Sequence, residues 1–576
     1  MSTQDRILQY LRPHAARAAY AVVAMFAVSL FNGTAVLLLK PIVDRIFIAR
    51  DLHMLWLAVF ALPLIISLKT MASYAQNYLM SWLGQKVTQE IRGDLFRKLH
   101  ALPLDYFAGH KSGEILSRTT GDLVVLQSAL TSVPLYLIRD SMTVAALLAS
   151  LFYLDWRFAL LSLGGLPLIA STLYVLGRKM RATSLQSQLM MGRITQRFQE
   201  SVQGMAFIKA FNYEQGVLEK FEAENDSFFA PTMSFLRATA LASPLLELCG
   251  GLVAAFILYL GGREVIVGRM TPGAFFAFLG AFFAAYAPIK NLARSNSELQ
   301  RAQACAERVF QLLDEPVDPK SVPSPAARPF SGLEHEVGFS GVWFRYAGRE
   351  DYALKSLDLN IKRGSRVALV GPSGSGKTTI ARLLLRLHDP ERGLVTFDGR
   401  DAREFELGGL RDQIGLVAQE TLLFNDTVFE NISLGRRVVT MSQVERACAL
   451  SGASEFIARL PNGYQTRLGD GGVPLSAGQR QKIAISRVIL KDPQILILDE
   501  ATSNLDSASE GEIISALETQ FKGRTVISIA HKLSSLPACD EIFVLSQGTL
   551  VESGSQQELL AKNGLFKRLH DLQASP

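Results

Sequence analysis

The sequence predicts a membrane bundle of six transmembrane α-helices with long intracellular extensions, followed by an α/β P-loop domain. Three observations carry this prediction. Long apolar runs occur only in the first half of the 576 residues. Beyond about residue 337, short β-rich runs alternate with helical patterns, as they do in soluble α/β domains. The second half also contains the phosphate-loop spacing G-x-x-x-x-G-K-[ST].

The composition agrees with a protein that lies partly in lipid. Hydrophobic residues make up 49% of the chain and charged residues 19%. The formal net charge of +6 is small for this length, so it does not indicate a nucleic-acid partner. The four cysteines are far apart and form no C-x-x-C pair, which argues against a disulfide framework or a zinc site.

Six apolar stretches are long enough to cross about 30 Å of hydrocarbon at 1.5 Å per residue. They are Ala18–Leu39, Leu55–Leu79, Leu135–Tyr153, Phe158–Leu176, Leu245–Leu260 and Pro272–Ile289. The polar stretches after the second and fourth keep a helical periodicity, so we expect these helices to continue into water. Both polar stretches are rich in Lys and Arg. The positive-inside rule therefore places them, and both chain termini, in the cytoplasm.

Composition marks a boundary after Leu313. The stretch "DEPVDPKSVPSPAARP" is rich in Pro and Ser, as linkers often are. We therefore expect a transmembrane domain over residues 1–313, a linker over 314–336 and a soluble domain over 337–576.

The stretch "RVALVGPSGSGKTTIARLL" contains the phosphate-loop motif between an apolar run and a helical pattern, which is the context that this motif requires. Backbone N–H groups of such a loop surround the phosphates of a nucleotide. Lys377 would place its positive charge on the phosphates, and the hydroxyl of Thr378 would ligate Mg²⁺. The loop residues expected at the nucleotide are Gly371, Pro372, Ser373, Gly374, Ser375 and Gly376.

The stretch "QILILDEATSNLD" supplies two carboxylates. Ile495–Leu498 is predicted to form a buried strand that ends at Asp499 and Glu500. A carboxylate at this place holds Mg²⁺ in P-loop NTPases, so Asp499 is the expected metal ligand. Glu500 could orient or deprotonate an attacking water. The adjacent pair therefore favours hydrolysis over transfer to a second substrate.

The segment "PLSAGQRQKIAISRVIL" places Ser476, Ala477 and Gly478 before a strong helical pattern. Backbone donors at a helix N-terminus can hold phosphate. Together with the phosphate loop and the Asp-Glu strand, this segment resembles the nucleotide-binding domain of ABC transporters, whose signature is LSGGQ. The signature here reads LSAGQ. We expect a working site despite Ala477, because Ser476 and Gly478 keep the main contacts.

The resemblance implies ATP as the nucleotide and gives roles to further residues. Glu500 and His531 correspond to the catalytic carboxylate and to the switch histidine at the γ-phosphate. The other matching positions are Tyr346, which would stack on adenine, Gln419, which would line the Mg²⁺ site, Gln479 of the signature, and Asp506 of the loop "SNLD" that communicates between two ATP sites.

In this family, ATP lies between the phosphate loop of one nucleotide-binding domain and the signature of another. The chain has one of each, so the resemblance implies half of a transporter. Because Glu500 and His531 are both present, both sites of a symmetric homodimer would hydrolyse ATP. A heterodimer with a related chain stays open.

The membrane half resembles the exporter branch of the family. "LHALPLDYFAGHKSGEILSRTTGD" resembles the first intracellular loop, and "FNYEQG" the loop that docks into the partner's nucleotide domain. "LLLKPIVDRIF" and "FYLDWRFALL" are similar to the lipid A flippase branch. The resemblance implies ATP-driven movement of an anionic lipid across a bacterial inner membrane. A multidrug exporter of hydrophobic compounds is the alternative, and an ATP-gated channel or regulatory membrane ATPase is a weaker one.

Three cations, Lys69, Arg139 and Lys290, fall within or beside apolar spans. At 1.5 Å per residue they lie about 21, 21 and 27 Å from the outer ends of their spans. In one interpretation the three cations are unrelated: Arg139 lies beside Asp140, Lys290 extends to the membrane interface, and Lys69 pairs with an unidentified acid. Alternatively they face one cavity and hold an anionic head group, since intramembrane charges often mark a substrate path. The lipid A flippases have basic residues at matching places, which favours the second interpretation.

Overall fold

The computed structural model describes residues 3–163, 186–187, 190–321, 327–434, 438–469, 472–499, 507–530 and 539–574. These residues divide into two compact units. The membrane unit comprises residues 1–96 and 116–314, and the ATPase unit comprises residues 97–115 and 315–576.

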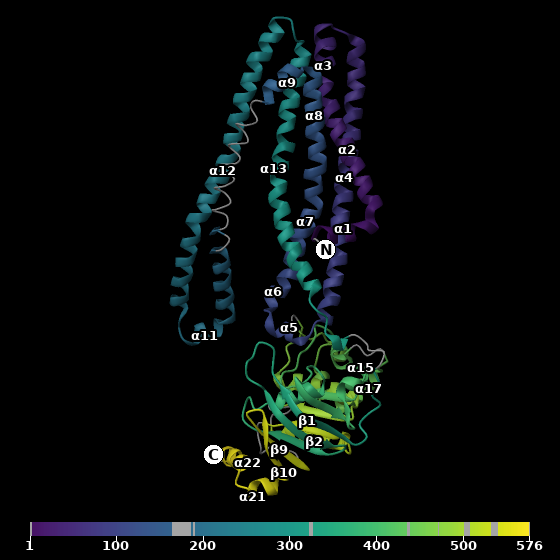
Figure 1. Ribbon diagram of the computed structural model, residues 1–576, viewed down its shortest axis with the longest axis vertical. Coiled ribbons are helices and arrows are strands. Elements are labelled where there is room, and N and C mark those ends of the chain that lie inside the picture. Colours follow the sequence, from purple (N-terminus) through teal and green to yellow (C-terminus); the bar gives the residue numbers. More distant parts are fainter. Residues whose placement is uncertain are drawn as a thin grey trace. The chain divides into compact units, whose positions relative to one another are not determined.

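The membrane unit is built from long helices (Figure 1). Its helices are α1 (Thr3–Leu11), η1 (Arg12–His14), α2 (Ala15–Leu37), α3 (Leu39–Pro41), η2 (Ile42–Ile48), α4 (Leu52–Ala101), α6 (Ser112–Leu116), η3 (Ser117–Gly121), α7 (Asp122–Pro134), η4 (Leu135–Asp140), α8 (Ser141–Leu154), α9 (Trp156–Leu163), α11 (Met205–Ala210), α12 (Glu214–Ile266) and α13 (Pro272–Asp314). The last residues of α4 and most of α6 belong to the ATPase unit.

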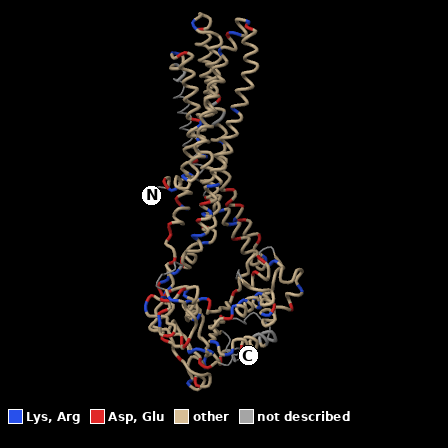
Figure 2. The backbone as a smooth tube through the Cα atoms, turned by 90° about the vertical axis from the view of Figure 1, so that its right-hand side faces the viewer, with Lys and Arg blue, Asp and Glu red and all other residues tan. Residues whose placement is uncertain are grey.

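Five helical stretches of the described chain are long and apolar enough to cross a membrane. They are Thr3–Ile48, Leu52–Ala101, Ser112–Leu154, Glu247–Ile266 and Pro272–Asp314. The fourth predicted span, Phe158–Leu176, begins in α9 and lies largely outside the described residues. Figure 2 shows few charged residues along the upper lengths of these helices. The helical membrane domain that the sequence predicts is therefore confirmed.

The long helices extend far beyond a bilayer, as the polar periodicity predicts. α4 contains 50 residues and α12 contains 53, whereas about 20 residues span the hydrocarbon. In Figure 1, α12 stands away from α8 and α13 over much of its length. Its C-terminal part packs on them, because Val253 and Ile257 share a buried cluster with Leu147 and Phe278.

Three hydrogen-bonded side-chain pairs join α13 to the continuous helix formed by α7, η4 and α8. The bonded pairs are Asp122 with Arg308 (2.6 and 2.8 Å), Ser132 with Glu298 (2.7 Å) and Asp140 with Asn291 (2.9 Å). The pairs keep one antiparallel register, because each step along one helix is matched by a step of similar length along the other. We call this set the polar ladder.

The ATPase unit contains two sheets. Their strands are β1 (Glu336–Phe344), β2 (Leu354–Lys362), β3 (Arg366–Val370), β4 (Arg392–Phe397), β5 (Arg400–Asp401), β6 (Ile414–Val417), β7 (Ile495–Asp499), β8 (Thr525–Ile529), β9 (Glu541–Ser546) and β10 (Thr549–Gly554). The first sheet is antiparallel, in the order β2-β1-β4-β5. The second runs β10-β9-β3-β8-β7-β6, and β9, β3, β8, β7 and β6 are parallel. The α/β domain is therefore confirmed.

Helices cover these sheets and connect their strands. They are α5 (Leu104–Gly109), η5 (Pro319–Ser321), α14 (Lys377–Leu384), η6 (Ala402–Glu404), α15 (Leu407–Asp412), α16 (Val428–Ser433), α17 (Met441–Leu450), α18 (Ser454–Ile457), η7 (Gly463–Gln465), α19 (Ala477–Lys491), α20 (Ser507–Gln520), α21 (Gln556–Ala561) and α22 (Leu565–Ala574). Two strands of the larger sheet are largely buried, since every residue of β8 is buried and Ile495 and Ile497 of β7 join the main core. Such runs are typical of parallel strands that are covered on both faces.

Residues 97–115 group with the ATPase unit, whereas the sequence boundaries place them in the transmembrane domain. This segment begins with the last residues of α4, which ends at Ala101, and contains α5. It contacts the start of the linker, where the Asp318 N–H donates to the Ala101 carbonyl (2.7 Å). The polar end of a membrane helix is therefore packed as part of the soluble fold.

Candidate nucleotide site

The phosphate loop joins β3 to α14 and depends on glycine at both ends. Gly371 has φ 151°, and a Cβ there would lie 2.1 Å from the carbonyl oxygen of Leu545. Gly376 caps α14 with φ 103°, and its Cβ would lie 2.8 Å from the Ala353 carbonyl oxygen. Both conformations are strained for residues with a side chain. The loop thus leads directly into a helix N-terminus, which favours a bound phosphate.

Lys377 and Thr378 take different places at the start of α14. The Lys377 side chain is buried, and its Nζ donates to the carbonyl oxygens of Gly371 (2.8 Å) and Pro372 (2.9 Å). These bonds hold the ammonium within the loop that would surround the phosphates. Thr378 is exposed at the loop surface, so its hydroxyl is available to a metal ion that arrives with a nucleotide.

Parallel pairing brings the other predicted residues to the same sheet edge. Leu369 of β3 and Asp499 of β7 both pair with Ile529 of β8. Asp499 is therefore level with the end of β3 in the sheet, and β8 lies between the two strands. Gln419 follows β6, which pairs with β7 through Val417 and Leu498.

Glu500, His531 and Asp506 lie outside the described residues, so their predicted roles stay predictions. Glu500 nevertheless follows Asp499 directly in the chain, and His531 comes two residues after Ile529 of β8. Glu500 and His531 are therefore close in the chain to described residues of this sheet edge.

The side chains at this edge suit magnesium. Thr378 offers a hydroxyl, Asp499 a carboxylate and Gln419 an amide oxygen, and Mg²⁺ prefers oxygen ligands. In the part of the chain that the structure describes, no group of three or more His, Cys, Asp and Glu side chains could hold a metal by itself. This agrees with an ion that takes few protein ligands and shares the phosphates of a nucleotide.

The signature segment forms a regular helix start. Ser476 caps α19: its Oγ accepts from the Gln479 backbone N–H (3.2 Å), and the Gln479 Oε1 accepts from the Ser476 N–H (2.9 Å). This is a capping box. Ala477 is the first helical residue and has no positive φ. Both bonds of this box lie within the signature segment itself.

Comparison with known proteins matches each half of the chain to a protein family. A family model described as "ABC transporter transmembrane region" matches residues 19–287. A second, described as "ABC transporter", matches residues 354–503. The chain belongs to the ABC transporter family. It is a multi-pass membrane protein whose ATPase domain couples ATP hydrolysis to transport.

Full-length relatives indicate which members of the ABC transporter family the chain resembles. The transporter is 37% identical over 573 residues to the "ATP-dependent lipid A-core flippase" of Syntrophus aciditrophicus (strain SB), covering 100% of this chain and 95% of that protein. It is 36% identical over 553 residues to the protein of the same name from Desulfotalea psychrophila, covering 96% of each. A solved structure, a bacterial Atm1-family ABC exporter with ATP bound, matches with a TM-score of 0.80 at 26% identity and covers 98% of this chain and 99% of its own.

Substitution of Ala477 by glycine should leave the transporter active. Ala477 adopts a helical conformation, so glycine gains nothing at this position and costs at most about 1 kcal/mol of helix stability. ATPase activity of the purified variant, with unfolding temperature as its control, checks this expectation. A large loss of activity at an unchanged unfolding temperature would show that Ala477 has a role of its own.

Tyr346 follows β1, near the helix that carries the phosphate loop. Its hydroxyl bonds to Thr379 Oγ1 (3.0 Å), and Arg382 Nη1 donates to the same hydroxyl (3.3 Å). Tyr346 is half-buried and packs edge-on against Phe344, with ring centroids 4.9 Å apart. Arg382 belongs to none of the sequence motifs, although it lies on α14 only five residues after Lys377.

The intramembrane cations are only partly brought together. Arg139 Nε donates to Asp140 Oδ1 (2.7 Å), as the interpretation of separate charges expects. Asp140 also accepts from Asn291, the neighbour of Lys290. The turns that carry Arg139 and Lys290 therefore lie side by side. Lys69 is half-exposed on α4, and none of its described contacts joins it to the other two cations.

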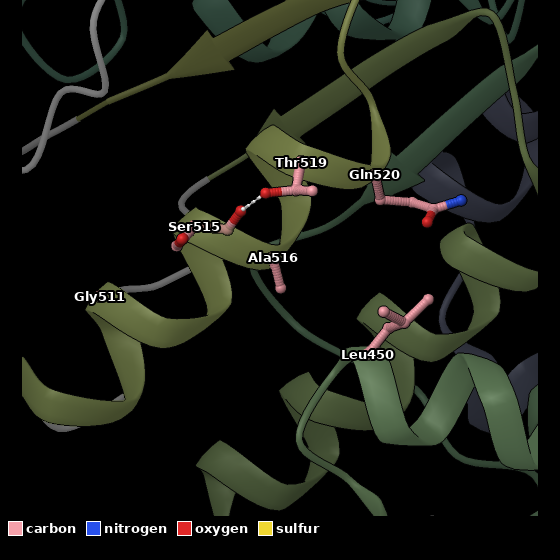
Figure 3. A pocket seen from close by; sticks show the side chains of 6 residues that line it. All are labelled: Leu450, Gly511, Ser515, Ala516, Thr519 and Gln520. Carbon is pink, nitrogen blue, oxygen red and sulfur yellow. Dashed lines mark hydrogen bonds between the residues drawn. The ribbon is translucent and has the colours of Figure 1, made fainter.

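A surface cavity of about 580 Å³ lies beside α20 in the ATPase unit (Figure 3). Its described lining is Leu450, Gly511, Ser515, Ala516, Thr519 and Gln520. None of these residues is charged and none was predicted at the nucleotide, so this cavity has no anchor for a triphosphate. The edge of the larger sheet is therefore the better candidate for the nucleotide site.

Proposed function

We propose that this transporter is an ATP-driven flippase that moves an anionic lipid, lipid A or a related phospholipid, from the inner to the outer side of a bacterial inner membrane. The observation that carries the proposal is the full-length likeness to flippases of that name, at 36–37% identity. The cations within its spans add to it, because an anionic head group needs them and a neutral hydrophobic drug does not.

The working unit in this proposal is a homodimer with two composite ATP sites. The phosphate loop of one copy would face the signature of the other, since each chain offers one of each. Exposed apolar residues on the α11–α12 segment support a second copy. Phe211 is 77% exposed and Phe229 is 66% exposed in the single chain. Both termini and the ATPase unit would lie in the cytoplasm, where ATP is supplied.

Within each composite site, Lys377 would bind the β- and γ-phosphates, and Tyr346 would stack on adenine. Thr378, Gln419 and Asp499 would hold Mg²⁺, which supplies positive charge to the phosphates when bound. Glu500 would orient a water and accept its proton as the water oxygen attacks the γ-phosphorus. The bond from that phosphorus to the β-phosphate oxygen breaks, and ADP and phosphate leave. His531 would contact the γ-phosphate.

In the membrane, Lys69, Arg139 and Lys290 would hold the phosphates of the lipid. Arg139 donates its Nε–H to Asp140. The Nη donors of the guanidinium would then bind an anion. Lys290 is exposed in the single chain, with Nζ 6.0 Å from the Tyr286 ring centroid. The exposed apolar faces of the spans would receive the acyl chains.

Neutralising all three cations should weaken anionic-lipid binding by about 100-fold or more. A charge-assisted bond contributes about 1.5–3 kcal/mol, and 1.4 kcal/mol is a factor of ten. The Lys69→Gln, Arg139→Gln, Lys290→Gln triple variant would be reconstituted in liposomes. Lipid affinity, ATP-dependent lipid movement and lipid-stimulated ATPase activity would be measured.

The matched control is a second triple variant, Arg157→Gln at the start of α9, Arg263→Gln in the last turn of α12 and Arg269→Gln between α12 and α13. It removes the same charge and should bind lipid as the parent does. Nucleotide binding should survive in both variants. If the cation variant bound and moved anionic lipid as well as the parent, the flippase proposal would yield to a multidrug exporter. Passive lipid flux without ATP would indicate a channel.

A further inference from the structure

A carboxylate of α5 meets a buried histidine of the ATPase fold. Asp105 Oδ1 lies 3.4 Å from His388 Nδ1. The His388 side chain is 9% exposed and the Asp105 side chain 44%. α5 belongs to the loop that follows α4, and this loop groups with the ATPase unit.

The other side of His388 faces the aromatic pair at the adenine end of the predicted nucleotide site. The His388 ring centroid lies 5.4 Å from that of Tyr346, edge to face at 87°. It lies 5.3 Å from the ring centroid of Phe344. Tyr346 in turn bonds to Thr379 on α14 (3.0 Å). One imidazole therefore stands between α5 and the helix that carries the phosphate loop.

The charges around His388 favour a neutral imidazole. Burial lowers the pKa of His388, and Lys320 and Arg382 lower it further, whereas Asp105 and Asp389 oppose them. The net pKa lies below the ordinary value of about 6.5. At neutral pH the ring is therefore uncharged, and a hydrogen on Nδ1 can be donated to the Asp105 carboxylate.

We propose that His388 is a positioning residue that links α5 to the adenine end of the ATP site, through Asp105 on one side and Tyr346 on the other. The inference rests on the proposed function, in which Tyr346 stacks on adenine. A movement of α5 would shift the imidazole, and the imidazole would shift the tyrosine ring against the base. The two sides of the link are chemically different, so they can be separated by mutation.

Three substitutions separate the two sides. His388→Phe keeps an aromatic ring against Tyr346 and removes the partner of Asp105. Asp105→Ala removes the same partnership from α5. His388→Ala removes both sides. The control is Asp492→Asn, which weakens an exposed ion pair with Arg524 in the same unit (3.3 Å) and suits the left-handed conformation of that residue (φ 49°).

The full-length transporter would be studied in liposomes of phosphatidylethanolamine and an anionic phospholipid. His388→Ala should raise the KM for ATP about fivefold and change kcat less than twofold. His388→Phe and Asp105→Ala should keep the KM within about twofold of the parent and lose most of the stimulation by anionic lipid. The double variant, His388→Phe with Asp105→Ala, should lose no more of this lipid stimulation than either single variant does. An unchanged KM in His388→Ala, or additive losses in the double variant, would overturn the proposal.

Failure of the proposed function would look different. If anionic lipid did not stimulate the parent, the lipid proposal would fall, but the KM measurement would still test the Tyr346 side. The Asp105 side would then be decided by the unfolding temperatures of the parent, the two single variants and the double variant. Non-additive changes support the Asp105–His388 contact, and additive changes remove it.

Discussion

The Glu500→Gln variant should hydrolyse ATP at least about 100-fold more slowly than the parent while binding ATP with similar affinity. The amide keeps the size of the carboxylate but cannot take a proton from the attacking water, and general-base assistance is worth about 10²–10⁴ in rate. The chain position supports the assignment, because Glu500 follows Asp499 at the end of β7. ATPase rates at saturating ATP and the dissociation constant for ATP measure the two quantities separately.

A glutamate far from the site provides the control for this prediction. Glu455 forms an exposed ion pair with Arg459, so Glu455→Gln should leave hydrolysis unchanged. A Glu500→Gln protein with nearly normal turnover would contradict the catalytic assignment. Weaker ATP binding in that variant would instead assign Glu500 to nucleotide binding.

Replacing Lys377 with alanine should weaken ATP binding by about 100-fold. The side chain is buried in the loop, where its ammonium bonds to two carbonyl oxygens. Those bonds hold the charge ready for the phosphates, and a charge-assisted bond contributes about 1.5–3 kcal/mol. Titration with ATP gives the affinity, and the ATP-induced rise in unfolding temperature gives a second measure of binding.

Lys491 is a suitable control for this substitution, because its Nζ also bonds to two backbone carbonyls, those of Arg411 and Ile414. Lys491→Ala should lower the unfolding temperature and leave the ATP-induced rise intact. Lys377→Ala should lose that rise. Equal ATP affinity in the Lys377 variant and the parent would remove Lys377 from the phosphate site.

The local structure of the candidate nucleotide site was predictable because its motifs encode backbone geometry. Gly371 and Gly376 are needed for their own φ angles, and Asp499 ends an apolar run that can only be a buried strand. Parallel pairing then brings these segments to one edge without further information from the sequence. The capping box at Ser476 is likewise a contact between near neighbours in the chain.

Contacts between distant residues were not predictable from one sequence. His388 lies in no motif, and its partner Asp105 is far away in a stretch whose helical periodicity continues that of α4. The periodicity therefore assigned residues 97–115 to the membrane half, although their packing groups them with the ATPase unit. The contact between Arg139 and Asp140 was foreseen because the two are adjacent, whereas the bond from Asn291 was not.

The polar ladder constrains how the membrane unit can change shape. A slide of α13 past α7 and η4 by one residue would misalign all three of its pairs together. It would also leave the buried Asp122 carboxylate without the Arg308 guanidinium, and a buried polar group without a hydrogen-bond partner is unfavourable. Rotation of the two helices as one rod breaks none of these bonds. The two helices therefore form one rigid body. This body can rotate as a unit, but its helices resist sliding along each other.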